Sequence, residues 1–281
     1  MNRTMLTATN TLTQLQKQMD IISNNMANID TNGYKRRDAT FSDLIHQQFN
    51  NQRNADEEVN RLTPNGIRVG TGARIAQTQL DMKQGGIKAT DRPLDTAFAS
   101  VGQLYKVLVQ DEAGNSSIQY TRNGAMYLSP LSDDEIALVT SDGHSILDEN
   151  DNPIYINGEP LDYSIDNHGR LSVRMAAGTD QIFDIGVVQV NKPQFLTANG
   201  NNLYGLPDNL NELGVALDDI FTDLGGPLRG EIAIQQGALE QSNVDMSKEM
   251  TDLIQTQRAY QFQSRSISIA DQMMGLVNGI R

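Results

Sequence analysis

The first thirty residues carry an unbroken heptad of apolar positions. Their spacings alternate between three and four residues from Met5 to Ile29, without an intervening Pro or Gly. This pattern predicts an amphipathic helix of coiled-coil character, roughly 40 Å long at 1.5 Å per residue. Asn32-Gly33 predicts its C-terminal stop. The apolar positions are Met5, Ala8, Leu12, Leu15, Met19, Ile22, Met26 and Ile29.

A second predicted helix occupies residues 243–281 and carries two apolar stripes. Both recur every seven residues, and an offset of two positions places them about 200° apart around the helix. A single partner helix covers only one stripe, and exposed apolar surface favours association. We expect other copies of the chain to cover the second stripe; packing on the chain's own β-rich region is the alternative. The first stripe contains Leu253, Tyr260, Ile267 and Met274, and the second contains Phe262, Ile269 and Leu276, with Met273 and Ile280 beside them.

Residues 71–242 predict a β-rich domain. Short apolar runs such as YKVLV (105–109), IALVT (136–140) and IGVVQV (185–190) alternate with turn dipeptides. This pattern favours small antiparallel sheets over βαβ units, so the predicted fold class is α+β. The turn dipeptides are Asn65-Gly66, Asn123-Gly124, Asp142-Gly143, Asn157-Gly158 and Asn199-Gly200.

Two further segments complete the predicted organisation. Residues 34–70 are polar and rich in Asn, Gln and Arg, which predicts an irregular arm, in part helical, with disorder before assembly left open. KQGGIKAT (83–90) and QQGALEQS (235–242) share a Gln-Gly-apolar pattern, which predicts that they pair as strands. The predicted parts are therefore 1–33, 34–70, 71–242 and 243–281.

The charge is concentrated in the middle of the chain. The net charge is −13; residues 91–230 hold 21 acidic and 7 basic side chains, and the rest holds 14 and 15. This balance argues against a nucleic-acid surface, which needs a basic footprint. An acidic block repels its copies, whereas nearly neutral ends can pack closely.

Composition also limits the compartment and the chemistry. The chain has no Cys, which excludes disulfides, thiolate metal sites and a cysteine nucleophile. No apolar stretch approaches the roughly 18–20 residues of a membrane span. Residues 1–10 lack a signal-peptide core, so composition alone favours the cytoplasm and any outside location needs a route without a cleaved signal.

Motifs for catalysis or metal binding are weak. His46, His144 and His168 are far apart and have no spaced partner, so we predict no metal site. Residues 148–152 resemble a calcium loop only loosely and predict a solvated acidic loop. Gly70-Thr-Gly72 lacks the third glycine of a dinucleotide motif, and the chain contains neither G-x-S-x-G nor a P-loop. We therefore expect no catalytic residue, no cofactor and no enzymatic activity.

The two ends resemble a known family. SNNMANIDTNGYK (23–35) resembles the signature of flagellar rod and hook proteins, and SNVDMSKEMTDLIQTQRAY (242–260) is similar to the other end of that family. Four internal segments look like rod-protein core segments in the expected order: QGGIKATDRPLD (84–95), YTRNGAMYLS (120–129), VTSDGHSIL (139–147) and NGNNLY (199–204).

The length of the chain and its middle segments are most similar to those of the distal-rod type, including rod paralogues of Gram-positive bacteria. The proximal-rod type and hook-type axial proteins are the alternatives within the family. One segment departs from the family pattern: residues 100–105 read SVGQLY where the family often has Gly-Asp/Asn-Gly-Phe-Phe.

The resemblance implies a non-enzymatic structural subunit of the bacterial flagellar basal body. Such subunits are exported by the flagellar type III apparatus without a cleaved signal. Their terminal helices pair as a coiled-coil-like stem and stack against copies of themselves and other axial proteins, forming a helical tube that transmits torque from motor to hook. The β-rich domain lies outside. A coiled-coil-tethered adhesin or fibre protein is the competing binding-module hypothesis, and a carbohydrate-active enzyme would need a cleft with close carboxylates.

The resemblance also implies assembly residues at both ends. The Asn-rich helix end would form hydrogen bonds across subunits, with capping of the Gly33 turn by Asn28 or Asn32 as the intramolecular alternative. The N-terminal assembly residues are Met5, Leu12, Leu15, Met19, Ile22, Asn24, Asn25, Met26, Asn28, Ile29, Gly33 and Tyr34. The C-terminal assembly residues are Asn243, Val244, Met250, Leu253, Ile254, Gln257, Arg258, Tyr260, Phe262, Ile267, Ile269, Met274 and Leu276.

Overall fold

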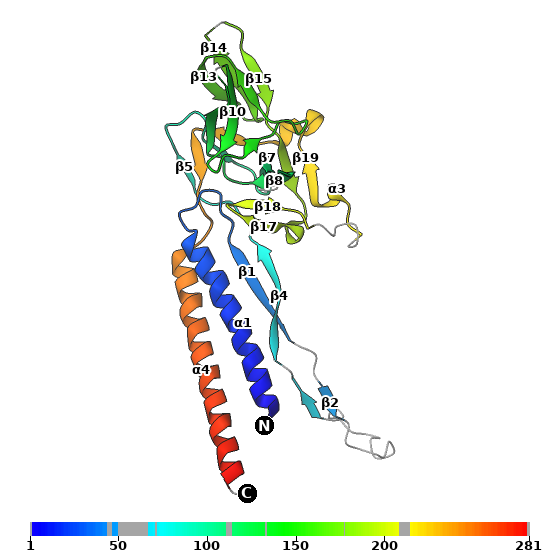
Figure 1. Ribbon diagram of the computed structural model, residues 1–281, viewed down its shortest axis with the longest axis vertical. Helices are drawn as coiled ribbons and strands as arrows, with labels where there is room; N and C mark the ends of the chain where they lie inside the picture. The colour runs from blue at the N-terminus through cyan, green and yellow to red at the C-terminus, as the bar shows by residue number, and fades with distance from the viewer. Residues whose placement is uncertain are drawn as a thin grey trace. The chain divides into compact units, whose positions relative to one another are not determined.

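The chain forms two compact units in a computed structural model (Figure 1). The terminal unit comprises Met1–Asn24, Arg37–Thr78 and Met246–Arg281, and the β unit comprises Asn25–Arg36 and Gln79–Asp245. The structure describes residues 2–43, 47–49, 67–70, 72–110, 114–132, 134–176, 178–207 and 214–279.

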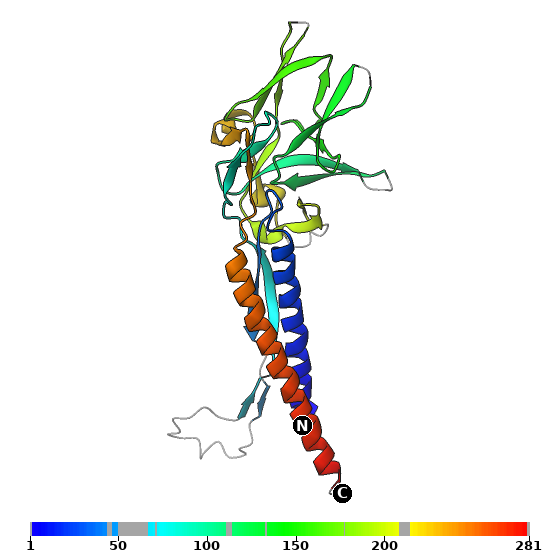
Figure 2. The ribbon, with the colours of Figure 1, turned by 90° about the vertical axis from the view of Figure 1, so that its left-hand side faces the viewer.

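The terminal unit contains the two long helices. Helix α1 spans Asn2–Ala27 and α4 spans Met246–Gly279. Both views place α4 alongside α1 in the opposite direction (Figures 1 and 2). Both predicted terminal helices are therefore confirmed as helices. No helix in the described part of the chain is both long and apolar enough for a membrane span.

Helix α1 ends earlier than the Asn32-Gly33 stop that the sequence predicts. The backbone N–H groups of Asn28 and Ile29 donate to carbonyls three residues earlier, at Asn25 and Met26. Such bonds tighten the last turn of a helix and release the chain into turns. Gly33 lies beyond this end at φ 70°, a left-handed conformation that glycine adopts readily.

The described part of residues 34–70 forms strands rather than the expected irregular or helical arm. Strand β1 (Arg37–Asp43) pairs with β4 (Ala73–Leu80), and β2 (Gln47–Phe49) pairs with β3 (Ile67–Val69). Each partner lies many residues away, so local pattern alone carried little strand signal. Residues 44–46, 50–66 and 71, which include His46 and Asn65-Gly66, lie outside the described residues.

Antiparallel strands build the β unit, as predicted. Its largest sheet has the order β12-β10-β11-β7-β8-β18-β17, with β9, β16 and β19 attached to it. The strands of this sheet are β7 (Gln103–Gln110), β8 (Ser116–Thr121), β9 (Met126–Pro130), β10 (Glu135–Thr140), β11 (Ser145–Ile146), β12 (Tyr155–Asn157), β16 (Val187–Val190), β17 (Thr197–Gly200), β18 (Leu203–Gly205) and β19 (Phe221–Asp223).

Smaller sheets and short helices complete the unit. Strands β13, β14 and β15 form a three-stranded sheet, β20 pairs with β6, and β21 pairs with β5. These elements are β5 (Ile87–Ala89), β6 (Thr96–Phe98), β13 (Pro160–Ile165), β14 (Arg170–Met175), β15 (Gln181–Asp184), η2 (Pro193–Phe195), α3 (Leu217–Ile220), η3 (Gly226–Glu231), β20 (Ile234–Gln236) and β21 (Ala238–Glu240).

Strand β7 buries side chains on both faces, because successive residues of a strand point to opposite sides. Leu104 packs in one apolar cluster with Tyr120 and Phe221, whereas Tyr105 packs in the larger cluster with Phe98. The Phe98 and Tyr105 ring centroids lie 4.3 Å apart. The segment that departs from the family pattern, residues 100–105, is therefore a turn at 100–102 followed by the buried start of β7 at 103–105.

Several turn and pairing predictions are confirmed. Gly143 and Gly158 adopt positive φ at two of the predicted turns. At the other two described sites the prediction is wrong: Gly200 ends strand β17 and the turn follows at Asn201-Asn202, and Gly124 has no positive φ. Strand β5 lies in the 83–90 segment and β21 in the 235–242 segment, and they pair antiparallel with Glu240 opposite Ile87. The Gln-Gly-apolar pattern that the two segments share therefore corresponds to a pair of strands.

Candidate functional site

The heptad of α1 lies on a covered face of the helix. Ala8 and Ile22 are buried, and the other positions from Met5 to Ile29 are half-buried. Leu6, which lies off the heptad, is exposed. The sequence pattern therefore identifies the face of α1 that is protected within one chain.

Helix α4 has a covered heptad face of its own. Leu253, Tyr260, Ile267 and Met274 are half-buried. The same face continues through buried positions that are not large apolar residues, namely Glu249, Thr256 and Ala270. The Thr256 hydroxyl donates to the Asp252 carbonyl at 2.7 Å, so it is satisfied within the helix.

The second stripe of α4 is exposed. Phe262 is 74% exposed and Leu276 is 70% exposed. Other exposed apolar side chains on α4 are Met246, Met250, Ile254, Ile269, Met273 and Val277. Gln257 and Arg258 are also exposed. Exposed apolar surface on this scale is typical of an interaction face.

The Asn-rich end of α1 forms bonds within the chain. Asn25 is 1% exposed, and its side-chain oxygen accepts a hydrogen bond from the Tyr34 hydroxyl at 3.2 Å. The Thr31 hydroxyl donates to the side chain of Asn28 at 3.2 Å. Both bonds lie within the chain, whereas Asn24 is exposed. Hydrogen bonding of the Asn-rich end across subunits stays a prediction.

Gly33 is fixed by packing as well as by its backbone angle. A Cβ atom at this position would lie 2.7 Å from the Arg122 carbonyl carbon. The Gly33 N–H also donates to the Glu240 carbonyl at 2.7 Å. Any side chain would therefore push residue 33 away from backbone that it contacts inside the β unit.

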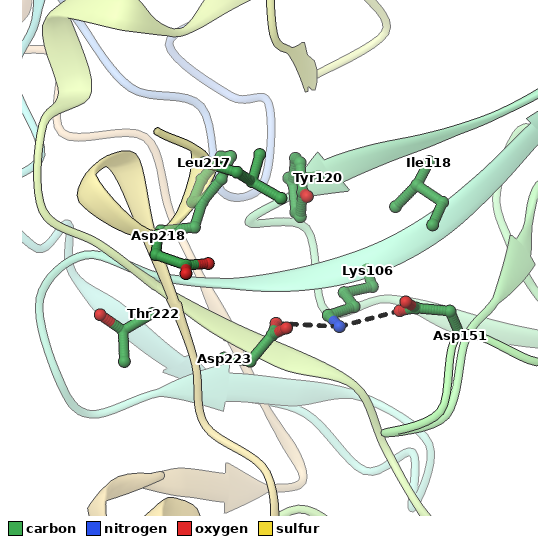
Figure 3. Close-up of a pocket in the computed structure, with 9 residues that line it drawn as sticks. Lys106, Ile118, Tyr120, Asp151, Leu217, Asp218, Thr222 and Asp223 are labelled. Atoms are coloured by element: carbon green, nitrogen blue, oxygen red, sulfur yellow. Dashed lines mark hydrogen bonds and ion pairs between the residues drawn. The ribbon is translucent and has the colours of Figure 1, made fainter. Parts of the chain in front are cut away.

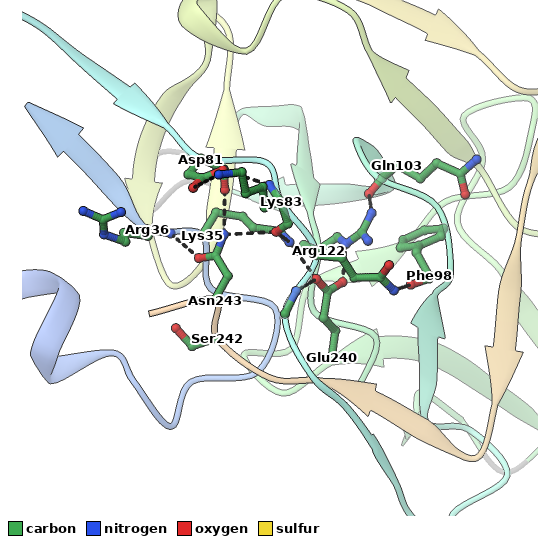
Figure 4. A network of polar contacts seen from close by, with 12 residues as sticks. Lys35, Arg36, Asp81, Lys83, Phe98, Gln103, Arg122, Glu240, Ser242 and Asn243 are labelled. Carbon is green, nitrogen blue, oxygen red and sulfur yellow. Dashed lines mark hydrogen bonds and ion pairs between the residues drawn. The ribbon is translucent and has the colours of Figure 1, made fainter. Parts of the chain in front are cut away.

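A buried ion triad lies beside this turn (Figure 4). The ammonium of Lys35 lies 2.6 Å from Glu240 Oε1, and Arg122 Nε lies 2.5 Å from Glu240 Oε2. The three side chains are 0%, 1% and 0% exposed for Lys35, Glu240 and Arg122. Glu240 Oε1 accepts a further bond from the Gly85 N–H at 2.9 Å.

The cations of the triad have backbone acceptors as well. Lys35 donates to the Lys83 carbonyl at 2.7 Å. Arg122 donates to the carbonyls of Gln103 at 2.6 Å and Ser100 at 2.9 Å. A buried ion pair is tolerable when such bonds satisfy its remaining donors, and removing one partner leaves an uncompensated charge.

Burial and charge act in opposition on the carboxyl of Glu240. Burial favours its neutral form, but Arg122, Lys35 and the bonds from Lys35 and Gly85 outweigh burial, so the pKa of Glu240 is lowered. For Lys35 burial is the dominant cause, and its pKa is lowered despite the attraction of Glu240. The Glu240 carboxylate is therefore held in its charged form.

Asn243 ties the same two stretches of chain together. Its side-chain oxygen accepts the Arg36 N–H at 2.8 Å, and its amide donates to the carbonyls of Asp81 at 2.8 Å and Lys83 at 3.0 Å. Val244 beside it is buried. Residues 33–36 and 240–243 thus form a junction, far apart in sequence but directly bonded.

The sequence pattern does not predict the ion triad. Lys35 lies in the segment 23–35, Arg122 in the segment 120–129 and Glu240 in the segment 235–242. A charged residue inside each of three motif segments, 23–35, 120–129 and 235–242, is the available signal. Nothing local indicates that these three charges are buried or that they meet.

The acidic loop at 148–152 is held by hydrogen bonds between the Asp148 carboxylate and backbone N–H groups of the same loop. One oxygen of Asp148 accepts the N–H groups of Asn150 and Asn152, both at 2.8 Å. This is an Asx-type turn, in which the carboxylate serves the loop itself. Among the described residues, no three His, Asp or Glu side chains gather where a metal ion could bind.

The two ends of the chain match known families. Residues 5–35 match the family described as "Flagella basal body rod protein", and residues 235–280 match "Flagellar basal body rod FlgEFG protein C-terminal". The first match includes Gly33, Tyr34 and Lys35, and the second includes Glu240 and all of α4. Both segments of the junction therefore fall within family-matching sequence.

Relatives match over the full length. The chain is 45% identical to the flagellar hook-basal body complex protein FlhP of Bacillus subtilis (strain 168), over the whole of both chains. It is 35% identical to the flagellar basal-body rod protein FlgG of Buchnera aphidicola subsp. Schizaphis graminum, over 92% of each chain. It is 33% identical to FlgG of Borreliella burgdorferi, over 100% of this chain and 99% of that protein.

These similarities extend through the β unit as well as the helices, so they are not confined to a shared helical motif. The resemblance that the two end signatures indicated is confirmed by alignments that also cover the core strands. The chain belongs to the flagellar basal-body rod protein family.

Proposed function

We propose that this structural rod subunit polymerises through its terminal helices, with the exposed stripe of α4 covered by neighbouring copies. One observation carries the proposal: α4 has a half-buried apolar stripe and, two positions away, an exposed one that includes Phe262 and Leu276. A helix with a single covered face would need no second stripe.

The energetics of the second stripe favour assembly. Fully burying a large apolar side chain contributes roughly 1.5–3 kcal/mol. Several such side chains per subunit, repeated along a polymer, offset the entropy lost on association. The nearly neutral charge of the chain outside residues 91–230 allows close packing, because 14 acidic and 15 basic residues nearly cancel there.

The proposal extends to pairing within one subunit. Helices α1 and α4 would pair through their half-buried heptad faces as a coiled-coil-like stem. Support comes from the alternating spacing of three and four residues on α1 and from the sevenfold recurrence on α4. The chain would reach the basal body through the flagellar type III export apparatus and transmit torque within the rod. Other axial proteins of the flagellum are the expected neighbours.

A charge placed on the exposed stripe tests this function. Phe262→Glu should abolish rods and motility, because an anion at a buried subunit contact is strongly unfavourable. Gln261→Glu is the matched control, since residue 261 is also exposed and receives the same charge. The measurements are swimming, export of the chain, and counts of complete rods in purified basal bodies.

The expected result is normal export of both variants and loss of rods for Phe262→Glu alone. Normal rods from Phe262→Glu would refute assembly through this stripe. Light scattering of the purified chain adds a second criterion. A discrete small oligomer that never polymerises would favour the tethered adhesin hypothesis instead.

A further inference from the structure

A pocket of about 270 Å³ lies on the β unit, and its lining residues belong neither to the junction nor to α1 or α4 (Figure 3). It is formed by β7, β8, the loop at Asp151, the short helix α3 and strand β19. Its apolar walls are Ile118, Tyr120, Leu217 and Phe221, and its polar groups are Lys106, Asp151, Asp218, Thr222 and Asp223.

Lys106 lines this pocket, and its side chain is only 6% exposed. Its ammonium lies 2.8 Å from Asp151 and 2.9 Å from Asp223. Burial favours the neutral amine, but the bonds and charges of these two carboxylates outweigh it, so the pKa of Lys106 is raised. Lys106 is therefore a permanent cation that already has its partners.

The pocket retains an excess of negative charge. Asp151, Asp218 and Asp223 line it together with the single ammonium of Lys106. Three carboxylates against one ammonium leave two negative charges uncompensated at neutral pH. The side chains of Asp151 and Asp223 are 46% and 67% exposed, and Asp218 is exposed, so an incoming group can reach them.

The walls offer apolar contact beside these acids. Leu217 is 51% exposed and Ile118 is 40% exposed. Tyr120 and Phe221 support them from the core, with ring centroids 4.2 Å apart. An aliphatic wall next to surplus carboxylate fits a lysine or arginine side chain, whose methylene stem packs while its cationic head binds acid.

We propose that this pocket receives a lysine or arginine side chain from a second copy of the chain. The inference rests on the proposed function, because polymerisation brings copies into contact. Charge complementarity indicates the donor: residues 91–230 hold 7 of the 22 basic side chains, and the rest of the chain holds 15. Acidic blocks repel one another unless basic segments of neighbouring copies compensate them.

Two adjacent aspartates of α3 provide a matched test. Asp218 lines the pocket, whereas Asp219, exposed on the same turn, does not line it and lies 3.6 Å from Lys192. Asp218→Lys should reduce complete rods at least fivefold, and Asp219→Lys should leave them within twofold of wild type. Circular dichroism of the purified variants should be unchanged, because both residues are exposed. Equal rod counts for the two variants would overturn the proposal.

A photoreactive residue in place of Leu217 identifies the occupant directly, with one in place of Phe262 as the reference. We expect the probe at 217 to capture a Lys- or Arg-containing peptide of a second copy in assembled basal bodies. Copy-to-copy capture at 262 without capture at 217 would overturn the pocket proposal and leave the proposed function intact. Capture of a different protein at 217 would also overturn it, and absence of capture at both positions would overturn both.

Discussion

The Lys35 ammonium lies 2.6 Å from Glu240 Oε1, although the two residues are separated by 205 positions in sequence. Lys35 follows the turn after α1, and Glu240 precedes the segment that leads to α4. Both fall inside the β unit, where Arg122 completes the triad. The β unit therefore fastens to each other the two chain segments that connect it to the helices.

Replacing Glu240 by Gln should destabilise the β unit strongly. The change leaves Lys35 and Arg122 buried without their counter-charge, which typically costs about 3–5 kcal/mol. Urea unfolding followed by near-ultraviolet circular dichroism of the tyrosines measures the effect. Glu159→Gln is the control, because Glu159 is exposed and undergoes the same chemical change. A loss below about 1 kcal/mol at Glu240 would contradict this account of the triad.

The contribution of Glu240 should disappear in acid. Its folded-state pKa lies below the usual 4.5 because Arg122 and Lys35 outweigh the effect of burial. Below pH 4.5 the unfolded chain takes up a proton at this carboxyl before the folded chain does, so stability falls with pH. The stability advantage of wild type over Glu240→Gln should be constant from mildly acidic to neutral pH and shrink as the pH falls below 4.5 through the folded pKa of Glu240. An advantage that grows in acid would reverse the assigned direction.

Gly33→Ala should lower the free energy of unfolding by more than the positive φ angle alone explains. Strain at a left-handed non-glycine residue costs roughly 1–3 kcal/mol, and here the added methyl also meets the Arg122 backbone at 2.7 Å. Gly143→Ala isolates the strain, since Gly143 has φ 85° and a Cβ there meets no atom within 4 Å. The melting temperature of Gly33→Ala in thermal unfolding should be well below that of Gly143→Ala. Equal melting temperatures would show that the close approach at Gly33 relaxes freely.

The local spacing of apolar residues predicted the helices and the exposure of their faces, which depend on neighbouring residues of one segment. The heptad of α1 and the two stripes of α4 follow from side-chain spacing along one helix, and exposure separates the stripes as the spacing indicated. The β5–β21 pair was predictable because both segments carry the same Gln-Gly-apolar pattern. The family was predictable because both signatures lie in continuous segments.

Long-range contacts determine the features that local sequence patterns do not predict. A lone Lys35 or Glu240 is typical of a solvated surface, and only the folded backbone brings the two charges together. Strand β1 acquires its partner from β4, more than thirty residues away, so its polar sequence predicted no strand. Gly33 lies beyond the end of α1 at Ala27, and its N–H is bonded to the Glu240 carbonyl, a long-range contact that the local Asn-Gly pattern does not predict.

Two isoleucines on α4 separate stability from assembly. Ile267 is half-buried and Ile269 is exposed, although only one residue lies between them. Ile267→Ala should loosen α4 by about 1 kcal/mol, because it removes partly buried methyl groups. Ile269→Ala should leave the isolated helix intact and weaken only contacts with other subunits.

Trypsin cleavage after Arg258 and Arg265 in the purified chain reports the first effect, and rod counts report the second. We expect faster cleavage only for Ile267→Ala, and fewer rods for Ile269→Ala despite its normal cleavage. If Ile269→Ala accelerates cleavage as much as Ile267→Ala does, both stripes stabilise the single subunit, and the exposed stripe no longer supports assembly between copies.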